Sequence, residues 1–342
     1  MRPLHLLSII LITAFVLTAC NTSSAPLPTP TAPPEPTAVT AKPLRVAVLM
    51  PSAANDLAFS QSMYDALVRI QSEMGGPEKM EFVYSQGMYI IDDAAAAIRT
   101  YASRDYDLVI AHGTQYGDIL KEIAPEFPET SFAWGNSTST WDLPNVFAYE
   151  AAAQEGGYVN GVLTATLTDS KVIGVIGPIE TGDAKLYVDG FRAGVAATDP
   201  GIQVKVTYIG SFSDVVLASE AATTFISEGA DIMTGTAQMV VGATGIAQEN
   251  DVLWFGTQSN QSILGPEIVV ASQVYHWEVV LKEIIAKIES GTLGGESFTI
   301  NLANGGEVME YNPAFALSTK ARAVGDATVK GIVEGTITVP VP

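Results

Sequence analysis

The stretch RVAVLMPSAAND occupies residues 45–56, and a helical pattern begins just beyond it, near Phe59. Its first half is an apolar run without polar alternation, and its second half is rich in turn-forming residues. This order predicts a buried strand, a loop and a helix. Because such strands are typical of parallel sheets covered by helices on both faces, the stretch predicts an α/β fold.

The same order of strand and helix recurs along the chain. In the first half we expect strands at 80–85, 107–113 and 131–136, with helices near 93–103 and 116–123. A second series has a strand at 146–150, a helix at 154–167 and strands at 171–177, 204–210, 231–236 and 252–257. Near the end we expect a strand at 268–272, a long helix near 274–289, and an antiparallel hairpin of 298–302 with 307–311 around Asn304-Gly305-Gly306.

The two series predict two doubly wound lobes of parallel sheet. Ligands of open α/β sheets bind beyond the carboxyl ends of the strands, so two facing lobes form a cleft lined by strand-end loops. We place the N-terminal lobe at 43–148, completed by about 274–295. The C-terminal lobe is placed at 149–273, completed by about 296–342. This geometry is typical of a protein that binds a small molecule.

The composition excludes several classes of protein. The 342 residues are enough for about two domains, and 47% hydrophobic residues against 16% charged residues supply buried cores. With 17 Lys and Arg against 37 Asp and Glu, the net charge of -20 opposes binding to nucleic acid. The single cysteine, Cys20, allows no intramolecular disulfide and no cysteine-based zinc site.

The first segment carries a targeting signal. An apolar run at 6–19 follows Arg2 and is too short for a permanent membrane span. Its end, LTAC at 17–20, resembles a bacterial lipobox, which implies a signal peptide at 1–19 and a lipid on Cys20. The alternative is an ordinary secretory signal with a chance cysteine. No later apolar run is long enough to span, so we expect the lipid alone to hold the body outside the cytoplasm.

The next segment, residues 20–42, is rich in Pro and Thr. Such a composition favours extended polyproline conformations, so we expect a semi-rigid tether. A glycosylated stalk or a disordered tail is the alternative. With a lipid anchor and a ligand cleft, the chain has the organisation of a solute-binding lipoprotein that delivers a small molecule to a membrane permease.

Three segments resemble the basic membrane protein family, whose best-known members are purine nucleoside receptor lipoproteins. NDLAFSQ at 55–61 is similar to the family's Asp-x-Ser-Phe-Asn-Gln signature. APEFPETSFA at 124–133 and YIGSFSD at 208–214, the latter followed by Ala221-Ala222 and residues 228–232, resemble two further family stretches. The resemblance spans about residues 44 to 315, and the order of the segments is more specific than any one of them.

The resemblance implies a type I periplasmic-binding-protein fold with three hinge crossovers and a purine base between two aromatic rings. Phe59 and Phe212 are the implied rings, since a planar base stacks well on an aromatic face. Asp56 would accept a hydrogen bond from a base N–H, and Asn55 and Ser60 belong to the same signature. Without the family context, an aromatic residue early in a helix is more often part of the core. An ABC permease and its ATPase are the implied partners.

The chain departs from the family at two places. The family's Gly-Val-Asp-x-Asp-Gln, whose acid commonly holds the sugar, is replaced by GTQSNQ at 256–261. A family lysine after Ser272 is replaced by QVYHW at 273–277. Thr257, Gln258, Tyr275 and His276 are therefore candidate ligand residues of neutral character. A free nucleobase or another flat heterocycle becomes an alternative ligand, and we expect discrimination between a nucleoside and its free base to be weaker than in the family's nucleoside receptors.

Other residues at predicted strand ends are further candidates. Gln115 and Tyr116 can hydrogen-bond or stack with a ligand, or form a structural turn. Trp134 ends a strand with Asn136, or it fills the core. Asp183, with Thr181 and Gly182, lies where a helix begins, as a ligand residue or as the N-cap. His276 is either a hydrogen-bond donor or packs at the hinge.

Catalysis is not expected. The sequence contains no GxSxG, GxxxxGK[ST], GxGxxG or HExxH motif, and of its three histidines His5 lies in the signal. We therefore expect no enzyme, no cofactor and no metal, and a monomeric body. A ligand-sensing surface lipoprotein or an adhesin on the same fold remains the competing class.

Overall fold

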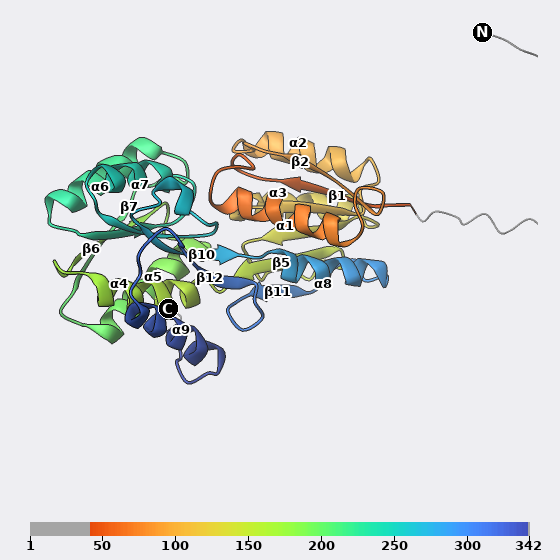
Figure 1. Ribbon diagram of the computed structural model, residues 1–342. Coiled ribbons are helices and arrows are strands. Elements are labelled where there is room, and N and C mark those ends of the chain that lie inside the picture. The colour runs from red at the N-terminus through yellow and green to blue at the C-terminus, as the bar shows by residue number, and fades with distance from the viewer. Residues whose placement is uncertain (1–41, 341–342) are drawn as a thin grey trace, which may run out of the picture. The chain divides into compact units, whose positions relative to one another are not determined.

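The computed structural model describes residues 42–340. The predicted signal peptide, Cys20 and nearly all of the predicted tether lie outside the described residues. Within them, two six-stranded sheets lie in two lobes that β10 (Val269–Tyr275) and neighbouring segments connect (Figure 1). The expected pair of α/β lobes is confirmed.

The first sheet is wholly parallel and belongs to the N-terminal lobe. Its strands, in spatial order, are β2 (Met80–Ser85), β1 (Leu44–Leu49), β3 (Leu108–His112), β4 (Ser131–Gly135), β5 (Val146–Ala151) and β11 (Ser297–Ile300).

The second sheet is parallel except at one edge, where β12 runs antiparallel to β10. Its strands, in spatial order, are β7 (Gln203–Tyr208), β6 (Val172–Gly177), β8 (Ile232–Gly235), β9 (Leu253–Gly256), β10 (Val269–Tyr275) and β12 (Glu307–Tyr311).

Helices cover both faces of the first sheet. The helices are α1 (Phe59–Glu73) and α8 (Glu278–Glu289) on one face, and α2 (Ile91–Ala102) and α3 (Gly117–Ile123) on the other. Val46 and Val48 of β1 belong to the core beneath α1, whereas Ala47 and Leu49 belong to the core beneath α2. Successive strand side chains point to opposite faces, so a strand covered on both sides must be apolar throughout.

The second sheet is covered in the same way. Its helices are α4 (Gln154–Leu167), α5 (Gly182–Thr198), α6 (Val215–Ser227), α7 (Val240–Glu249) and α9 (Thr319–Val333). The α6 and α7 helices share one core, and α4 and α9 contribute to another. Three short 3-10 helices complete the described elements: Thr114–Tyr116, Ala124–Glu126 and Ser262–Leu264.

Glycines allow α4 and α5 to pack backbone against backbone. A Cβ on Gly161 would lie 2.2 Å from the carbonyl oxygen of Phe191, and one on Gly190 would lie 2.1 Å from that of Gln154. Both distances are far below van der Waals contact, so a side chain at either position would push the helices apart. This contact positions the beginning of α5, which borders the cavity described below.

Two sequence-based expectations near the C-terminus are wrong. The predicted hairpin does not form, because β11 pairs with β5 of the first sheet and β12 pairs with β10 of the second. The long helix begins at Glu278 rather than near 274, because β10 continues through Tyr275. In both cases a strand partner distant in sequence decides the local structure, and no local pattern reports it.

The chain passes between the lobes three times, at 152–153, 276–277 and 301–306. These crossings lie a few residues after the limits expected from the sequence, because β5, β10 and β11 each extend to the hinge. The backbone N–H of Ala152 donates to the Ile300 carbonyl at 2.8 Å, and that of His276 donates to the Gly306 carbonyl at 2.7 Å. The first crossing is thus hydrogen-bonded to the end of β11, and the second crossing to the third.

A buried carboxyl, Glu307, joins the three crossings. Its Oε1 accepts from the backbone N–H of Gly156 at 2.7 Å and from the Gln273 side-chain amide, which also donates to the Ala153 carbonyl at 3.0 Å. Burial raises the pKa of Glu307 to about 8, and the nearby Glu155 carboxylate adds to this effect. Glu307 is therefore mostly protonated at neutral pH.

Among residues 42–340, no helix combines the length and apolar character needed to cross a membrane.

Candidate functional site

A cavity of about 320 Å³ lies between the two lobes. Its lining residues follow the carboxyl ends of eight parallel strands, four in each sheet, as expected for two facing α/β lobes. They are Pro51, Phe59, Tyr89, Ile91, Gly113, Thr114, Gln115 and Asn136 from the N-terminal lobe, and Ile179, Thr181, Gly182, Asp183, Ala184, Gly210, Ser211, Phe212, Ser213, Ala237, Gln238 and Gln258 from the C-terminal lobe.

The N-terminal side of the cavity presents an aromatic ring with a solid backing. Phe59 is 7% exposed, and its ring stacks on the His112 imidazole with 3.8 Å between centroids and 7° between planes. His112 in turn stacks on Tyr149, and Trp277 meets Phe59, His112 and Tyr149 edge-on. Since His112 covers one face of Phe59, a planar ligand can stack only on the other.

His112 is neutral and held as one tautomer. Its Nε2 lies 3.1 Å from the Phe59 carbonyl oxygen, which only accepts, so Nε2 carries the proton. Nδ1 then accepts from the Tyr149 hydroxyl at 2.8 Å. Burial lowers the pKa of His112 to about 3. These contacts fix the ring against which Phe59 packs.

Asp56 does not line the cavity, and its carboxylate holds the turn that carries Phe59. Its carboxylate accepts from the backbone N–H groups of Ala58 at 2.9 Å, Gln61 at 3.0 Å and Ser60 at 3.1 Å, at the beginning of α1. Burial raises the pKa of Asp56, and these three hydrogen bonds oppose the rise. Both oxygens are used to hold the turn that carries Phe59.

The C-terminal side of the cavity presents polar groups. Asp183 is 8% exposed, and its Oδ2 accepts from Gln258 Nε2 at 3.0 Å and from the Tyr275 hydroxyl at 3.2 Å. Burial raises the pKa of Asp183, and the two donors oppose the rise. Helix α5 begins at Gly182 with Thr181 as its N-cap, so Asp183 is not the N-cap but lies in the first turn. Three residues considered separately in the sequence thus form one cluster.

Phe212, the second implied ring, lies on the loop between β7 and α6. It is half-buried, and no aromatic ring of residues 42–340 stacks on it. The loop is held by a hydrogen bond from the Met239 N–H to the Phe212 carbonyl at 3.1 Å and by the Asp214 carboxylate, which caps α6. Phe59 and Phe212 both line the cavity, one from each lobe.

Two other candidate aromatic residues fill the core beside the cavity. Tyr116 is fully buried, and its hydroxyl donates to the Met88 carbonyl at 2.8 Å. Trp134 stacks on Trp141 with 4.5 Å between centroids, and its indole N–H donates to the Gly113 carbonyl at 3.2 Å. Both therefore lie behind the loop 113–115, of which Gln115 lines the cavity.

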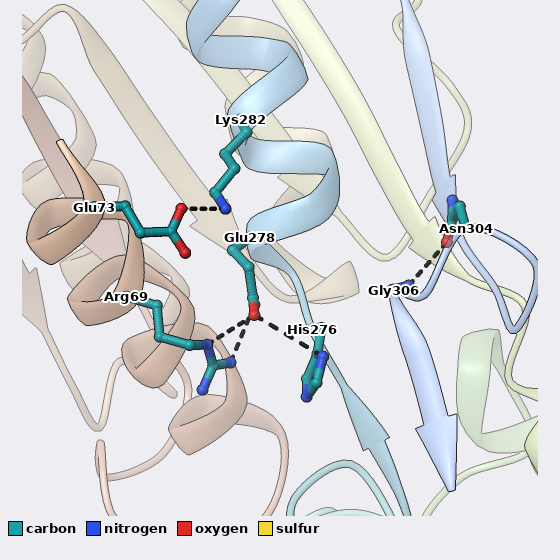
Figure 2. A network of polar contacts seen from close by, with 7 residues as sticks. All are labelled: Arg69, Glu73, His276, Glu278, Lys282, Asn304 and Gly306. Atoms are coloured by element: carbon teal, nitrogen blue, oxygen red, sulfur yellow. Dashed lines mark hydrogen bonds and ion pairs between the residues drawn. The ribbon is translucent and has the colours of Figure 1, made fainter.

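His276 is placed at the hinge and does not line the cavity. Its Nδ1 lies 4.0 Å from Glu278 Oε1, and the Arg69 guanidinium donates to both Glu278 oxygens at 2.7 and 3.0 Å (Figure 2). An ion pair between Lys282 and Glu73 continues this contact between α1 and α8. The hinge-packing alternative fits these contacts.

The remaining candidates, Asn55, Ser60 and Thr257, do not line the cavity either. Asn55 is exposed, whereas Ser60 and Thr257 are fully buried. The Ser60 hydroxyl accepts from the Ser52 N–H at 3.1 Å, and the Thr257 hydroxyl donates to the Gly235 carbonyl at 3.0 Å. Ser60 and Thr257 therefore stabilise loops rather than present a group to the cavity.

Several lining residues were not identified from the sequence. Tyr89 and Gln238 come from opposite lobes, and the Gln238 amide donates to the Tyr89 hydroxyl at 3.1 Å across the cleft. Two further interlobe bonds run from the Ser259 hydroxyl to the Ala58 carbonyl at 2.8 Å and from the Gln261 amide to the Leu57 carbonyl at 3.1 Å. Their position could have identified Tyr89 and Gln238 as candidates, because both follow predicted strands.

The lining is electrostatically simple. Asp183 is its one charged residue, and no Lys, Arg or His of the described residues contributes to it. Residues 42–340 also contain no group of three or more His, Cys, Asp or Glu arranged to hold a metal ion. The cavity is suited to a neutral ligand with a flat apolar part and hydrogen-bonding groups.

The family model described as ABC transporter substrate-binding protein PnrA-like, Bmp, matches residues 44–340. The chain belongs to this family. Members of the Bmp family are substrate-binding proteins of ABC transporters, which is a binding class and not an enzyme class. The interlobe cavity is the candidate substrate site of this member.

Relatives of this Bmp protein carry several kinds of name. Transcriptional activator protein med of Bacillus subtilis (strain 168) is 25% identical over 263 residues, covering 76% of this chain and 80% of that protein. ABC transporter nucleoside-binding protein BmpA of Lactococcus lactis subsp. cremoris is 26% identical over 311 residues, covering 84% and 86%. The structure of an ABC transporter solute-binding protein from Conexibacter woesei matches with a TM-score of 0.72 and 24% identity over 87% of this chain and 98% of that one. The structural likeness supports the fold.

Proposed function

We propose that this protein binds a purine nucleoside or a related purine between its lobes and delivers it to an ABC permease. The single observation that carries the proposal is the placement of Phe59 and Phe212, which line one cavity from opposite lobes. A planar base between two rings gains about 1–3 kcal/mol per stacking contact. The nucleoside-binding name of the Lactococcus lactis relative agrees with this ligand class.

A free nucleobase or another flat heterocycle is the alternative ligand. It is favoured by Gln258, which lies in the cavity where the family motif leads us to expect an acid for the sugar. The amides of Gln115, Asn136 and Gln238 offer donors and acceptors to the polar edge of either ligand. A role in direct nucleic acid binding is opposed by the net charge of -20.

Calorimetric titration tests the ligand class. Protein that has been unfolded and refolded, to remove any ligand carried through purification, is titrated with inosine, guanosine, adenosine, hypoxanthine and guanine. We expect saturable binding of at least one of these compounds. Absence of binding to all five would overturn the purine assignment and leave the family and the fold unchanged.

We further propose that the body is held outside the cytoplasm by a lipid on Cys20, with residues 20–42 as the tether. The proposal is supported by LTAC at 17–20 and by the Pro-rich composition that follows. A Cys20→Ala variant should leave the membrane fraction and lose labelling by a radioactive fatty acid. Residues 43–342 produced alone should fold as a monomer, because the described core is complete without the first 41 residues. Unchanged membrane retention of Cys20→Ala would contradict the lipid anchor, and an obligate dimer would contradict the monomer.

A further inference from the structure

The charge of the cavity is concentrated at one end of one helix. Four consecutive residues, 181–184, line the cavity, and they comprise the N-cap and the first turn of α5. A helix N-terminus carries unpaired backbone N–H groups and a partial positive charge, so it attracts anions. Here the first turn already contains an anionic group of the protein, because the carboxyl of Asp183 lies in it.

The Asp183 carboxyl is held in one orientation. Gln258 Nε2 and the Tyr275 hydroxyl both donate to Oδ2, whereas no side chain of residues 42–340 donates to Oδ1. The backbone N–H groups of Asp183 and Ala184 also hydrogen-bond to the carboxyl. Gln258 adopts a left-handed φ of +67°, which is strained for a non-glycine residue. Its second amide atom, Oε1, is buried without a partner. One acceptor oxygen, Gln258 Oε1, is therefore unpaired beside the Asp183 carboxyl, and both residues line the cavity.

No positive side chain balances this acid. Among the described lining residues there is no Lys, Arg or His, and the nearest supporting groups, Gln258 and Tyr275, are neutral donors. A phosphate placed beside Asp183 would meet a like charge in a partly desolvated site, which disfavours its binding. An N–H or O–H of a ligand would instead meet an oriented acceptor.

We propose that Asp183 selects the ligand: it accepts a hydrogen bond from an N–H or O–H of the solute and rejects solutes that are negatively charged at the α5 end, phosphorylated ones above all. Gln258 and Tyr275 are positioning residues that orient the carboxyl. The identity of the solute as a purine rests on the proposed function, but the rejection of anions does not. The sequence offered Asp183 as a ligand residue or as the N-cap, and its contacts with Gln258 and Tyr275 favour the first of these roles.

The test compares Asp183→Asn with Asp189→Asn. Both variants remove one negative charge from α5, but Asp189 pairs with Lys185 outside the cavity lining. Inosine and inosine 5′-monophosphate are titrated into each refolded protein by calorimetry. In a second arm, the melting temperature is followed in 10 mM inorganic phosphate against sodium chloride of equal ionic strength.

We expect the wild-type protein and Asp189→Asn to bind inosine about a hundredfold or more tighter than its monophosphate. In Asp183→Asn, inosine affinity should fall about ten- to a hundredfold, because a hydrogen bond to a charged acceptor is lost, and the monophosphate should gain. Phosphate should raise the melting temperature of Asp183→Asn only. Tyr275→Phe should reduce the difference in affinity between inosine and its monophosphate, but by less than Asp183→Asn does. If Tyr275 had a purely structural role, its replacement would leave this difference unchanged.

The outcomes separate the two proposals. If no purine binds the wild-type protein, the proposed function fails, and the phosphate arm still decides the role of Asp183. Equal affinity of the wild-type protein for inosine and its monophosphate would overturn the selection by Asp183. So would a phosphate response that is the same in Asp183→Asn and Asp189→Asn. If Asp183→Asn is not folded, Asp183→Ser takes its place in both arms.

Discussion

The two sides of the cavity are built in different ways. On the N-terminal side, Phe59 is buried against His112, which Tyr149 and Trp277 enclose, and every polar atom of the imidazole is hydrogen-bonded. On the C-terminal side, Phe212 lies half-buried on a loop and lines the same cavity as Asp183 and Gln258. The first side offers a rigid, neutral surface on which a flat ligand can stack. The second side offers oriented hydrogen-bonding groups and a negative charge.

This difference separates stability from selectivity. A residue in the aromatic stack contributes to folding and to binding at once, because its packing partners belong to the core. A residue on the opposite loop contributes mainly to binding. Variants of the rings Phe59 and Phe212, and of the buried titratable groups His112 and Glu307, therefore test the comparison.

The largest effect is expected for Phe59→Ala. Removing a ring buried at 7% exposure leaves a void above His112 and should lower the free energy of unfolding by about 3–5 kcal/mol. Urea denaturation measures this loss. A loss below about 1 kcal/mol would show that the stack does not belong to the core.

The next effect concerns Glu307, the buried acid on the C-terminal side of the hinge. Its folded pKa of about 8 lies above the unfolded value of 4.5, so its stabilising contribution is complete below pH 4.5 and is lost as the pH rises to 8. Glu307→Gln has no titrating carboxyl at this position. Its free energy of unfolding, relative to that of the wild-type protein, should therefore rise by about 3 kcal/mol between pH 5 and pH 8. Chemical denaturation at the two pH values measures the gain. A wild-type and a variant profile that run parallel would contradict it.

His112 gives the opposite pH dependence on the N-terminal side. Its folded pKa of about 3 lies below the unfolded value of 6.5, so its contribution is complete above pH 6.5 and is lost as the pH falls toward 3. Between pH 6.5 and pH 4.5 the loss is about 2–3 kcal/mol. Over the same pH interval, protonation of Glu307 stabilises the folded protein and opposes the effect of His112. The loss due to His112 is therefore measured in the Glu307→Gln variant. Adding His112→Asn should flatten the remaining slope, and an unchanged slope would refute the neutral buried imidazole.

The smallest effect on stability is expected for Phe212→Ala. With no stacking partner among residues 42–340, this ring should contribute less than about 1 kcal/mol to unfolding. It should nevertheless contribute about 1–3 kcal/mol to purine binding, or roughly ten- to a hundredfold in affinity. Calorimetry on the same preparation used for denaturation checks both numbers. Full affinity with unchanged stability would move the stacking site elsewhere.

Much of the fold could be predicted from the sequence because its signals are local. The limits of β2 and α4 agree with the predicted 80–85 and 154–167, since apolar runs and helical periodicity depend only on neighbouring residues. The pairing of the C-terminal strands could not be predicted from local signals, and the expected hairpin does not form. Strand β11 instead pairs with β5, about 150 residues earlier, and no local pattern in either strand identifies its partner.

The site divides in the same way. The sequence by itself determined the two lobes, the strand-end cavity and the list of residues from which a site is made, Phe59, Phe212, Asp183 and Gln258 among them. Only the tertiary structure decided their roles. It uses Asp56 to hold α1, backs Phe59 with His112, and brings Asp183, Gln258 and Tyr275 within hydrogen-bonding distance across 75 and 92 residues of chain. The physical reason is that a hydrogen bond or a stack depends on position in space, which sheet pairing and hinge geometry set after the local elements have formed.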